Sequence, residues 1–298
     1  MKKIIALVMA LLMVVCTLAA CGGKSNEDFV ATDAADLIKE DFGIAVRKGN
    51  SALLAEVNKV VDAWVKDGTM TKYVDYYTQL SDYEAGKEGV TAPEAGDLKV
   101  SWDFGSATET ITVYTESGFA PFEFLSGNKV IGVDIAIMSQ VALNMGKKID
   151  VQDVAFDTIP TCVQQSTGDA VGAAGMTISE ERMETVDFSN VYYSSTLVIV
   201  SDKKAPIASV KDLAGKKVAV QEGTSGDLII SAAAEEGGHS YVTEDDDGNE
   251  ITVTIKAAGA EVMRYKQYAL AFADLKAGRV DAILMDKLPA LTMLAVAD

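Results

Sequence analysis

The feature that most constrains the fold of this chain is a regular alternation of short apolar strands and amphipathic helices from Ile111 onward. Such alternation is typical of α/β folds built on parallel-rich sheets with helices on both faces. Ligands in these sheets bind beyond the carboxyl ends of the strands. The expected strands are residues 111–114, 149–154, 170–174, 196–201, 217–220 and 282–285, and the expected helices are residues 133–145, 159–165, 226–234 and 268–277. We expect Pro289 to open a last helix, because proline suits the first helical position.

The first residues have the composition of a secretory signal. Lys2 and Lys3 precede an apolar run at residues 4–15, and small residues lead up to Cys21. A charged start, an apolar centre and a small-residue cleavage site define such a signal. The alternative is an uncleaved membrane anchor, since the apolar run nearly reaches spanning length. Both interpretations place the rest of the chain outside the cytoplasm.

The residues just before Cys21 resemble the lipobox of bacterial lipoproteins, in the sequence LAAC at residues 18–21. The resemblance implies that residues 1–20 are a lipoprotein signal peptide, that Cys21 is lipidated and that residues 21–28 are a tether. Two acyl chains are enough for stable anchoring at a membrane.

Composition limits the partners and cofactors. The formal net charge of −18 disfavours nucleic acid as a partner. With Cys16 and Cys21 assigned to the signal and the lipid, Cys162 stands alone, and His239 is the single histidine, so no metal or other cofactor is expected. The acidic residues 244–250 only loosely resemble a calcium loop, and we interpret them as the turn of a surface hairpin.

Before the alternating region the pattern differs. Residues 51–66 have a clear helical periodicity, and residues 69–80 predict a further helix. Residues 81–110 contain several glycines and little periodicity, and they are interpreted as a linker. The remaining length suits two domains of ordinary size.

Seven motifs in the alternating region occur in the order found in bacterial extracellular solute-binding proteins of family 3, which serve polar amino-acid ABC importers. The chain therefore resembles that family over nearly all of its mature length. The resemblance implies a type II periplasmic-binding-protein-like fold, in which two α/β lobes are joined by two hinge strands. The motifs are residues 114–124 (YTESGFAPFEF), 132–135 (GVDI), 174–182 (AGMTISEER), 186–193 (VDFSNVYY), 210–220 (VKDLAGKKVAV), 223–226 (GTSG) and 278–286 (GRVDAILMD).

One departure from the family concerns residues 42–50 (FGIAVRKGN), which stand near the C-terminus in its members but come early here. The resemblance then implies a circular permutation, which proteins tolerate where the ends fall in exposed connections. The alternative is an unrelated helical domain at the N-terminus. On the permuted mapping, lobe 2 comprises residues 29–41 and 196–298, lobe 1 comprises residues 42–80 and 111–195, and residues 81–110 link them.

The resemblance assigns a subsite for the carboxylate of a free amino acid. Arg182 matches the arginine that grips this group, and its planar fork suits bidentate pairing. Thr177 matches a hydroxyl donor to the same carboxylate. Thr224 and Ser225 lie in a turn that opens a helix, where backbone N–H groups favour an anion. Outside this context, Arg182 would be interpreted as a surface residue paired with neighbouring glutamates.

The resemblance also assigns the ammonium subsite. Asp286 matches the carboxylate that holds the α-ammonium, and the carbonyl of Gly175 should accept a second hydrogen bond from it. The alternative for Asp286 is a helix N-cap. Phe119 matches an aromatic ring that lies against the ligand side chain, and Phe156 is expected to cover the other face; core packing is the alternative for both.

Two polar residues are expected to contact the ligand side chain. Glu116 and Gln221 occupy positions that do so in relatives, one from each lobe. A carboxylate beside an amide suits a basic or amide side chain better than an acidic one, although Lys129 could reverse that preference.

The sequence therefore predicts a monomeric binding lipoprotein of an ABC importer, not an enzyme, at the extracellular face of the membrane or in the periplasm. It would capture a free amino acid between two closing lobes and deliver it to a permease. The alternatives are an amino-acid sensor module and a dehydratase-like enzyme on the same fold, since fold alone does not fix function.

Overall fold

The computed structural model describes residues 24–298 except 38, 97, 99–100, 245–248 and 297–298. The signal segment and Cys21 therefore lie outside the described residues. Within the described part of the chain, no helix combines the length and hydrophobicity needed to cross a membrane.

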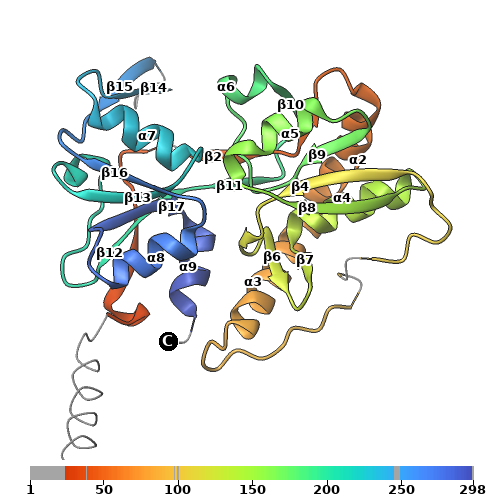
Figure 1. Cartoon of the computed structure of the whole chain (residues 1–298), viewed down its shortest axis with the longest axis horizontal. Helices are drawn as coiled ribbons and strands as arrows, with labels where there is room; N and C mark the ends of the chain where they lie inside the picture. The colour runs from red at the N-terminus through yellow and green to blue at the C-terminus, as the bar shows by residue number, and fades with distance from the viewer. Residues whose placement is uncertain (1–23, 38, 97, 99–100, 245–248, 297–298) are drawn as a thin grey trace, which may run out of the picture.

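The chain forms two α/β lobes that stand side by side (Figure 1). Lobe 1 is built on a five-stranded sheet of order β10-β3-β9-β4-β8, and a small sheet of order β5-β6-β7 lies beside it. The strands of lobe 1 are β3 (Ala45–Arg47), β4 (Thr110–Thr115), β5 (Gly118–Phe119), β6 (Glu123–Ser126), β7 (Lys129–Ile131), β8 (Lys148–Asp153), β9 (Asp169–Gly172) and β10 (Val186–Phe188). Its helices are α2 (Ser51–Asp67), α3 (Thr69–Glu84), α4 (Val133–Asn144), η2 (Phe156–Thr158), α5 (Ile159–Gln165) and α6 (Glu180–Met183).

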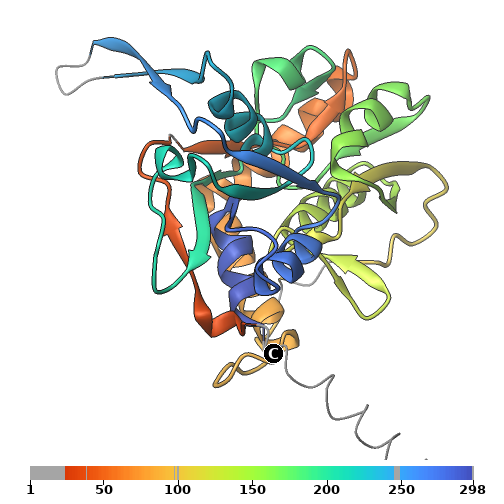
Figure 2. The same ribbon diagram turned by 60° about the vertical axis from the view of Figure 1, so that its left-hand side comes forward.

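Lobe 2 repeats the plan with a five-stranded sheet of order β1-β12-β17-β13-β16. Its sheet strands are β1 (Phe29–Asp33), β12 (Leu197–Asp202), β13 (Lys217–Gln221), β16 (Glu261–Tyr265) and β17 (Ala282–Asp286). Its helices are η1 (Asn26–Asp28), η3 (Val210–Leu213), α7 (Ser225–Ala234), α8 (Tyr268–Lys276) and α9 (Lys287–Ala295). The hairpin predicted around residues 244–250 is formed by β14 (His239–Glu244) and β15 (Glu250–Ile255), which pair antiparallel and project from the lobe (Figure 2).

Two short strands connect the lobes. β2 (Glu40–Phe42) pairs antiparallel with β11 (Tyr193–Ser195), so the chain crosses between the lobes at both strands. A second contact lies below this pair, where α9 of lobe 2 packs on α3 of lobe 1 (Figure 2). Two adjacent extended strands are a suitable hinge, because small changes in their backbone angles can move one lobe against the other.

The N-terminal segments are shared between the lobes and do not form a domain of their own. β1 pairs antiparallel with β12 at the edge of the lobe 2 sheet. β3 lies inside the lobe 1 sheet, between β10 and β9, and α2 packs on α4. An independent helical domain at the N-terminus is therefore wrong, because these segments complete both sheets.

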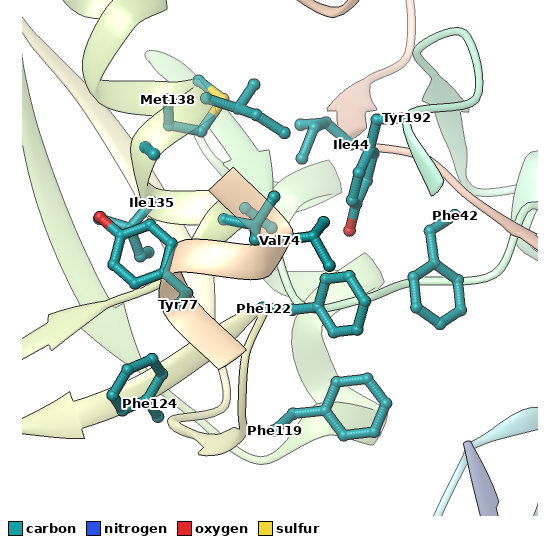
Figure 3. Packing of buried hydrophobic residues seen from close by; sticks show 14 of the residues in the cluster. Phe42, Ile44, Val74, Tyr77, Phe119, Phe122, Phe124, Ile135, Met138 and Tyr192 are labelled. Carbon is teal, nitrogen blue, oxygen red and sulfur yellow. The ribbon is translucent and has the colours of Figure 1, made fainter. Parts of the chain in front are cut away.

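The core of lobe 1 continues into the hinge through a group of aromatic rings (Figure 3). Phe42, in the hinge strand β2, packs edge-on against Phe122 with ring centroids 5.2 Å apart. Phe119 contacts Phe122 in turn, at 5.9 Å. Phe122 is fully buried and Phe124 nearly so, as expected for core residues. The hinge strand is thus held on the lobe 1 side by buried apolar surface.

Several sequence expectations need correction. The sheets are parallel-rich as expected but not wholly parallel, because β3 in lobe 1 and β12 in lobe 2 run antiparallel to both of their neighbours. α3 runs on to Glu84, so the linker begins later than predicted. α9 begins at Lys287 and not at Pro289, whose missing N–H is tolerated anywhere in a first helical turn.

Candidate functional site

All ten residues predicted to bind ligand line one cavity between the lobes. The space between its lining atoms, open solvent included, is about 300 Å³. Lobe 1 contributes the residues up to Arg182 and lobe 2 the remainder. The lining residues are Glu116, Phe119, Glu123, Phe156, Ala174, Gly175, Thr177, Arg182, Gln221, Thr224, Ser225 and Asp286.

Arg182 is the cation of the cavity. It lies in the short helix α6, where Ser179 caps the first turn by accepting from the Arg182 N–H, and only 9% of the residue is exposed. The guanidinium donates to the Thr177 carbonyl at 2.7 Å and, across the lobe boundary, to the Gly223 carbonyl at 2.9 Å. It also stacks 5.3 Å from the centre of the Phe156 ring. The alternative of a surface arginine paired with neighbouring glutamates is therefore wrong.

Opposite Arg182, the wall of the cavity is formed by the N-terminus of α7, where Thr224 and Ser225 lie. Thr224 is the N-cap, with its side chain accepting from the Asp227 N–H at 3.3 Å. A Cβ on Gly226 would meet the Leu284 carbonyl oxygen at 2.9 Å, so only glycine lets this first turn pack so closely on β17. The positive end of the helix therefore faces the cavity from lobe 2 and favours a negative ligand group.

Asp286 is the last residue of β17, and only 7% of it is exposed. It precedes α9 in the N-cap position, but its side chain makes no capping hydrogen bond. Instead Asp286 Oδ1 accepts from Ser195 Oγ of the hinge strand at 2.5 Å. Burial, and then the nearby Glu40 carboxylate, raise the pKa of Asp286 well above its usual value. A cation that enters the cavity would relieve this cost.

Gly175 has a structural reason to be glycine. Its φ is +54°, and a Cβ there would lie 2.5 Å from the Phe119 ring. Its N–H donates at 2.9 Å to Asp134, a fully buried carboxylate whose pKa is raised to about 7 by burial. The loop at Gly175 is thereby fixed against Phe119, which lies over the cavity on the lobe 1 side.

Glu116 and Gln221 meet across the lobe boundary as the sequence suggested. Gln221 Nε2 donates to one Glu116 oxygen at 3.0 Å, and Gln267 Nε2 donates to the other at 3.1 Å. Burial is the main cause that raises the pKa of Glu116, and these two amides oppose it. Lys129 is not in the cavity, because its Nζ lies over the Trp102 ring at 5.0 Å.

The structure adds three residues that the sequence analysis missed, namely Glu40, Glu123 and Gln267. Glu123 is fully buried, and neither of its oxygens has a hydrogen-bond partner in the part of the chain that the structure describes. Burial is the first cause that raises the pKa of Glu123 well above its usual range, and Asp134, Glu116 and Asp286 raise it further. The sequence signal that could have identified Glu123 is its position between two core phenylalanines, in the sequence FEF at residues 122–124.

A larger hollow lies elsewhere, between α3, residues 89–91 and the tyrosines at 192 and 193. Its empty volume is about 1360 Å³, but its lining includes no arginine or lysine, so it offers no counter-charge to a ligand carboxylate. Among the described residues there is also no group of three or more His, Cys, Asp or Glu side chains that could hold a metal ion.

The cavity between two α/β lobes, with opposite buried charges inside it, is the arrangement of a two-lobed solute-binding protein. The profile of the bacterial extracellular solute-binding proteins, family 3, matches residues 111–278, which is more than half of the chain. The chain belongs to this family, and its fold is the type II periplasmic-binding-protein fold.

Individual relatives bind amino acids. Over 119 residues the chain is 38% identical to the arginine-binding extracellular protein ArtP of Bacillus subtilis, covering 40% of this chain and 46% of that protein. The chain thus spans about half the length of that relative. An ancestral arginine-binding protein bound to arginine has 34% sequence identity and a TM-score of 0.52, covering 62% of this chain and 73% of the other. An ancestral arginine-binding protein bound to glutamine also has 34% sequence identity and a TM-score of 0.52, covering 62% of this chain and 72% of the other.

Proposed function

We propose that this protein binds a free L-amino acid in the cavity between its lobes. The observation that carries the proposal is that two buried side chains of opposite charge type, Arg182 from lobe 1 and Asp286 from lobe 2, line the same cavity. A zwitterion supplies a carboxylate for the first and an ammonium for the second. Desolvated charges require such partners, so this constellation selects an α-amino acid over a sugar or a neutral peptide group.

Each part of the ligand then has its own partners. The α-carboxylate binds the Arg182 guanidinium and the N-terminus of α7 at Thr224 and Ser225. The α-ammonium binds Asp286 and the Gly175 carbonyl. The rings of Phe119 and Phe156 enclose the aliphatic part of the side chain, because both line the cavity and bury apolar surface there.

The ligand side chain is basic or an amide, with a basic group favoured. Glu116 and Glu123 line the cavity, and Glu123 has no partner among the described residues. A cationic side chain would compensate these carboxylates, whereas an acidic one would add a third negative charge. The names of the relatives, which bind arginine or glutamine, agree with this class.

The test is a thermal-shift panel with each common L-amino acid. Residues 24–298 are first unfolded and refolded to remove any carried-over ligand. Because a ligand that binds only the native state raises the unfolding midpoint, we expect a large shift with L-arginine or L-lysine and a smaller one with L-glutamine. A folded protein that responds to no amino acid would refute the proposal.

We propose further that the protein is a lipid-anchored component of an ABC importer, working as a monomer outside the cytoplasm and delivering the amino acid to a permease. The support is the LAAC sequence ending at Cys21 together with the family membership. Fatty-acid labelling in a bacterial host tests the anchor: label on the wild type and none on Cys21→Ala is expected. An unlabelled wild-type protein would contradict it.

We also propose that the chain is a circular permutant of its family. The family match begins at residue 111, yet β1, β2 and β3 complete the two sheets and the hinge. The two ends of the described chain are adjacent, since Asn26 Nδ2 donates to the Val296 carbonyl at 2.8 Å. Residues 111–298 expressed alone should fail to unfold cooperatively, because lobe 1 then lacks the inner strand β3. A cooperative transition would refute the proposal.

A further inference from the structure

Glu40 is a buried carboxylate in the hinge. It is the first residue of β2, directly opposite Ser195 of β11 in the strand pairing, and only 9% of it is exposed. It does not itself line the cavity, but it contacts residues that do. A buried charge in the segment that bends when the lobes close is costly, so its partners are informative.

The partners of Glu40 are the hydroxyl groups of the carboxylate subsite. Ser225 Oγ of lobe 2 donates to Thr177 Oγ1 of lobe 1 at 3.0 Å, and Thr177 Oγ1 donates to Glu40 Oε2 at 3.3 Å. Each hydroxyl has a single proton to donate. Whether Ser225 donates to Thr177 or to Glu40 itself, both protons are used within this cluster, and neither hydroxyl is left to donate to a ligand.

Glu40 also interacts electrostatically with the guanidinium group of Arg182. Burial raises the pKa of Glu40, and hydrogen bonding from Ser225, the Arg182 charge and hydrogen bonding from Thr177 oppose that rise. In the same way, Glu40 is the first of the carboxylates that stabilise the buried Arg182 cation. The groups assigned to the ligand carboxylate thus already serve an internal carboxylate.

We propose that Glu40 is an internal competitor of the ligand's α-carboxylate and so sets the affinity of the site. In the ligand-free protein it holds the Thr177 and Ser225 hydroxyls and balances Arg182. An arriving α-carboxylate needs the same donors and the same cation, so it binds against Glu40. The inference rests on the proposed amino-acid binding function, and it concerns the head group that all α-amino acids share.

Competition of this kind makes the affinity for the ligand depend on pH. A ligand carboxylate beside Arg182 places a second negative charge near Glu40, which favours the protonated form of Glu40. The other ionisable groups that act on this position are Asp286 of β17 and Tyr268 of α8. Proton uptake on binding means that affinity for an α-amino acid increases as the pH falls toward the mildly acidic range.

The experiment compares two probes on three proteins by calorimetry at about pH 6, where the α-amine of both probes is protonated. L-arginine has an α-carboxylate, and L-argininamide lacks it but keeps the ammonium and the guanidinium. Wild type, Glu40→Gln and Asp41→Asn are used. Asp41 is the matched control, because it is the next residue of β2, is exposed, and accepts from Ser194 instead.

We expect Glu40→Gln to raise the affinity ratio of L-arginine to L-argininamide about tenfold, equivalent to about 1.4 kcal/mol, with Asp41→Asn changing it less than about twofold. A ratio that is unchanged or lower in Glu40→Gln overturns the inference but leaves the proposed function standing. If wild type binds neither L-arginine nor any other amino acid, the proposed function fails and the inference with it.

Wild-type protein gives a second measurement if Glu40→Gln does not fold. Titrations in two buffers of different ionisation enthalpy report the protons exchanged on binding. Net uptake with L-arginine that exceeds the value for L-argininamide is expected. Equal proton exchange for the two probes would overturn the inference.

Discussion

The two ends of the cavity are built differently. At the head-group end, Arg182 and Asp286 each have hydrogen-bond partners within the protein before any ligand arrives. At the side-chain end, Glu116 is held by two amides, while Glu123 has no partner in the described part of the chain. On the proposed assignment, the first end is prepared for what all amino acids share, and the second has a buried carboxyl group without a partner, which a cationic side chain would favour in its ionised form.

This difference indicates where affinity and specificity arise. Because the head-group partners come from both lobes and the hinge, changes there should affect all amino-acid ligands alike. Because Glu123 belongs to β6 in lobe 1 and lies among other carboxylates, changes there should affect cationic ligands selectively. The predictions below test this separation, from the largest expected effect to the smallest.

The largest effect should come from Arg182→Ala. It removes the one cation that lines the cavity among the described residues and leaves a ligand carboxylate desolvated without a partner. Loss of one member of a buried charge pair costs about 2–5 kcal/mol, so affinity should fall by a factor of about 30 to several thousand for every amino acid. Calorimetry measures it, with circular dichroism confirming the fold. Binding close to the wild-type level would show that the head-group assignment is wrong.

Glu123→Gln should have the second largest effect and should be selective. Gln is nearly isosteric but neutral, so L-arginine affinity should fall by about 10- to 100-fold, the cost of about 1.4–3 kcal/mol for a lost charge contact. L-citrulline, the neutral analogue of arginine, should bind almost as before. Glu88→Gln, at an exposed position of the linker, is the charge-matched control. Equal losses for both ligands would place Glu123 outside the side-chain subsite.

Glu123→Gln should weaken the binding of L-arginine but increase the stability of the protein without ligand. Burial raises the pKa of Glu123 well above its usual value and the pKa of Asp134 to about 7. The folded state therefore binds more protons than the unfolded state. The free energy of unfolding should therefore fall as the pH rises from about 4 through 7. Urea unfolding should show a smaller fall in Glu123→Gln and a more stable protein near neutral pH. A decrease in stability at neutral pH would contradict this.

The fold that forms the two ends of the cavity could be predicted only in part from the sequence. Periodicity located most of the longer helices and the central strands of both lobes, because apolar strands and amphipathic helices follow simple rules. It missed β3, β5, β6, β7, β10 and β16. It also did not reveal that β3 and β12 run against the other strands of their sheets, since periodicity does not encode which strands become neighbours or their direction. Such pairings are decided by contacts between residues far apart in the chain.

The candidate site shows the same limit. The ten residues predicted to bind ligand line one cavity. Eight of them stand in motifs whose order and spacing were recognisable, and the other two, Phe156 and Gln221, lie outside those motifs. Glu40 and Gln267 lie outside those motifs and reach the site only through the pairing of the hinge strands and through a contact across the lobes. Glu123 lies inside a motif, but its burial without a partner depends on how β6 packs.

The smallest effect should come from Gln267→Ala, which tests how strongly the two amides hold Glu116. Gln267 is exposed and donates one hydrogen bond to Glu116, whereas Gln221 is buried and donates to both Glu116 and the Lys266 carbonyl. One exposed hydrogen bond contributes about 0.5–1 kcal/mol, so L-arginine affinity should change by about two- to fivefold, in either direction. Gln221→Ala, measured alongside, should lower affinity more, because it leaves buried polar groups unpaired. Gln267→Ala could instead cause the same selective loss of L-arginine affinity as Glu123→Gln. In that case Glu116, which is held between the two lobes, determines the preference for a cationic side chain, and Glu123 does not.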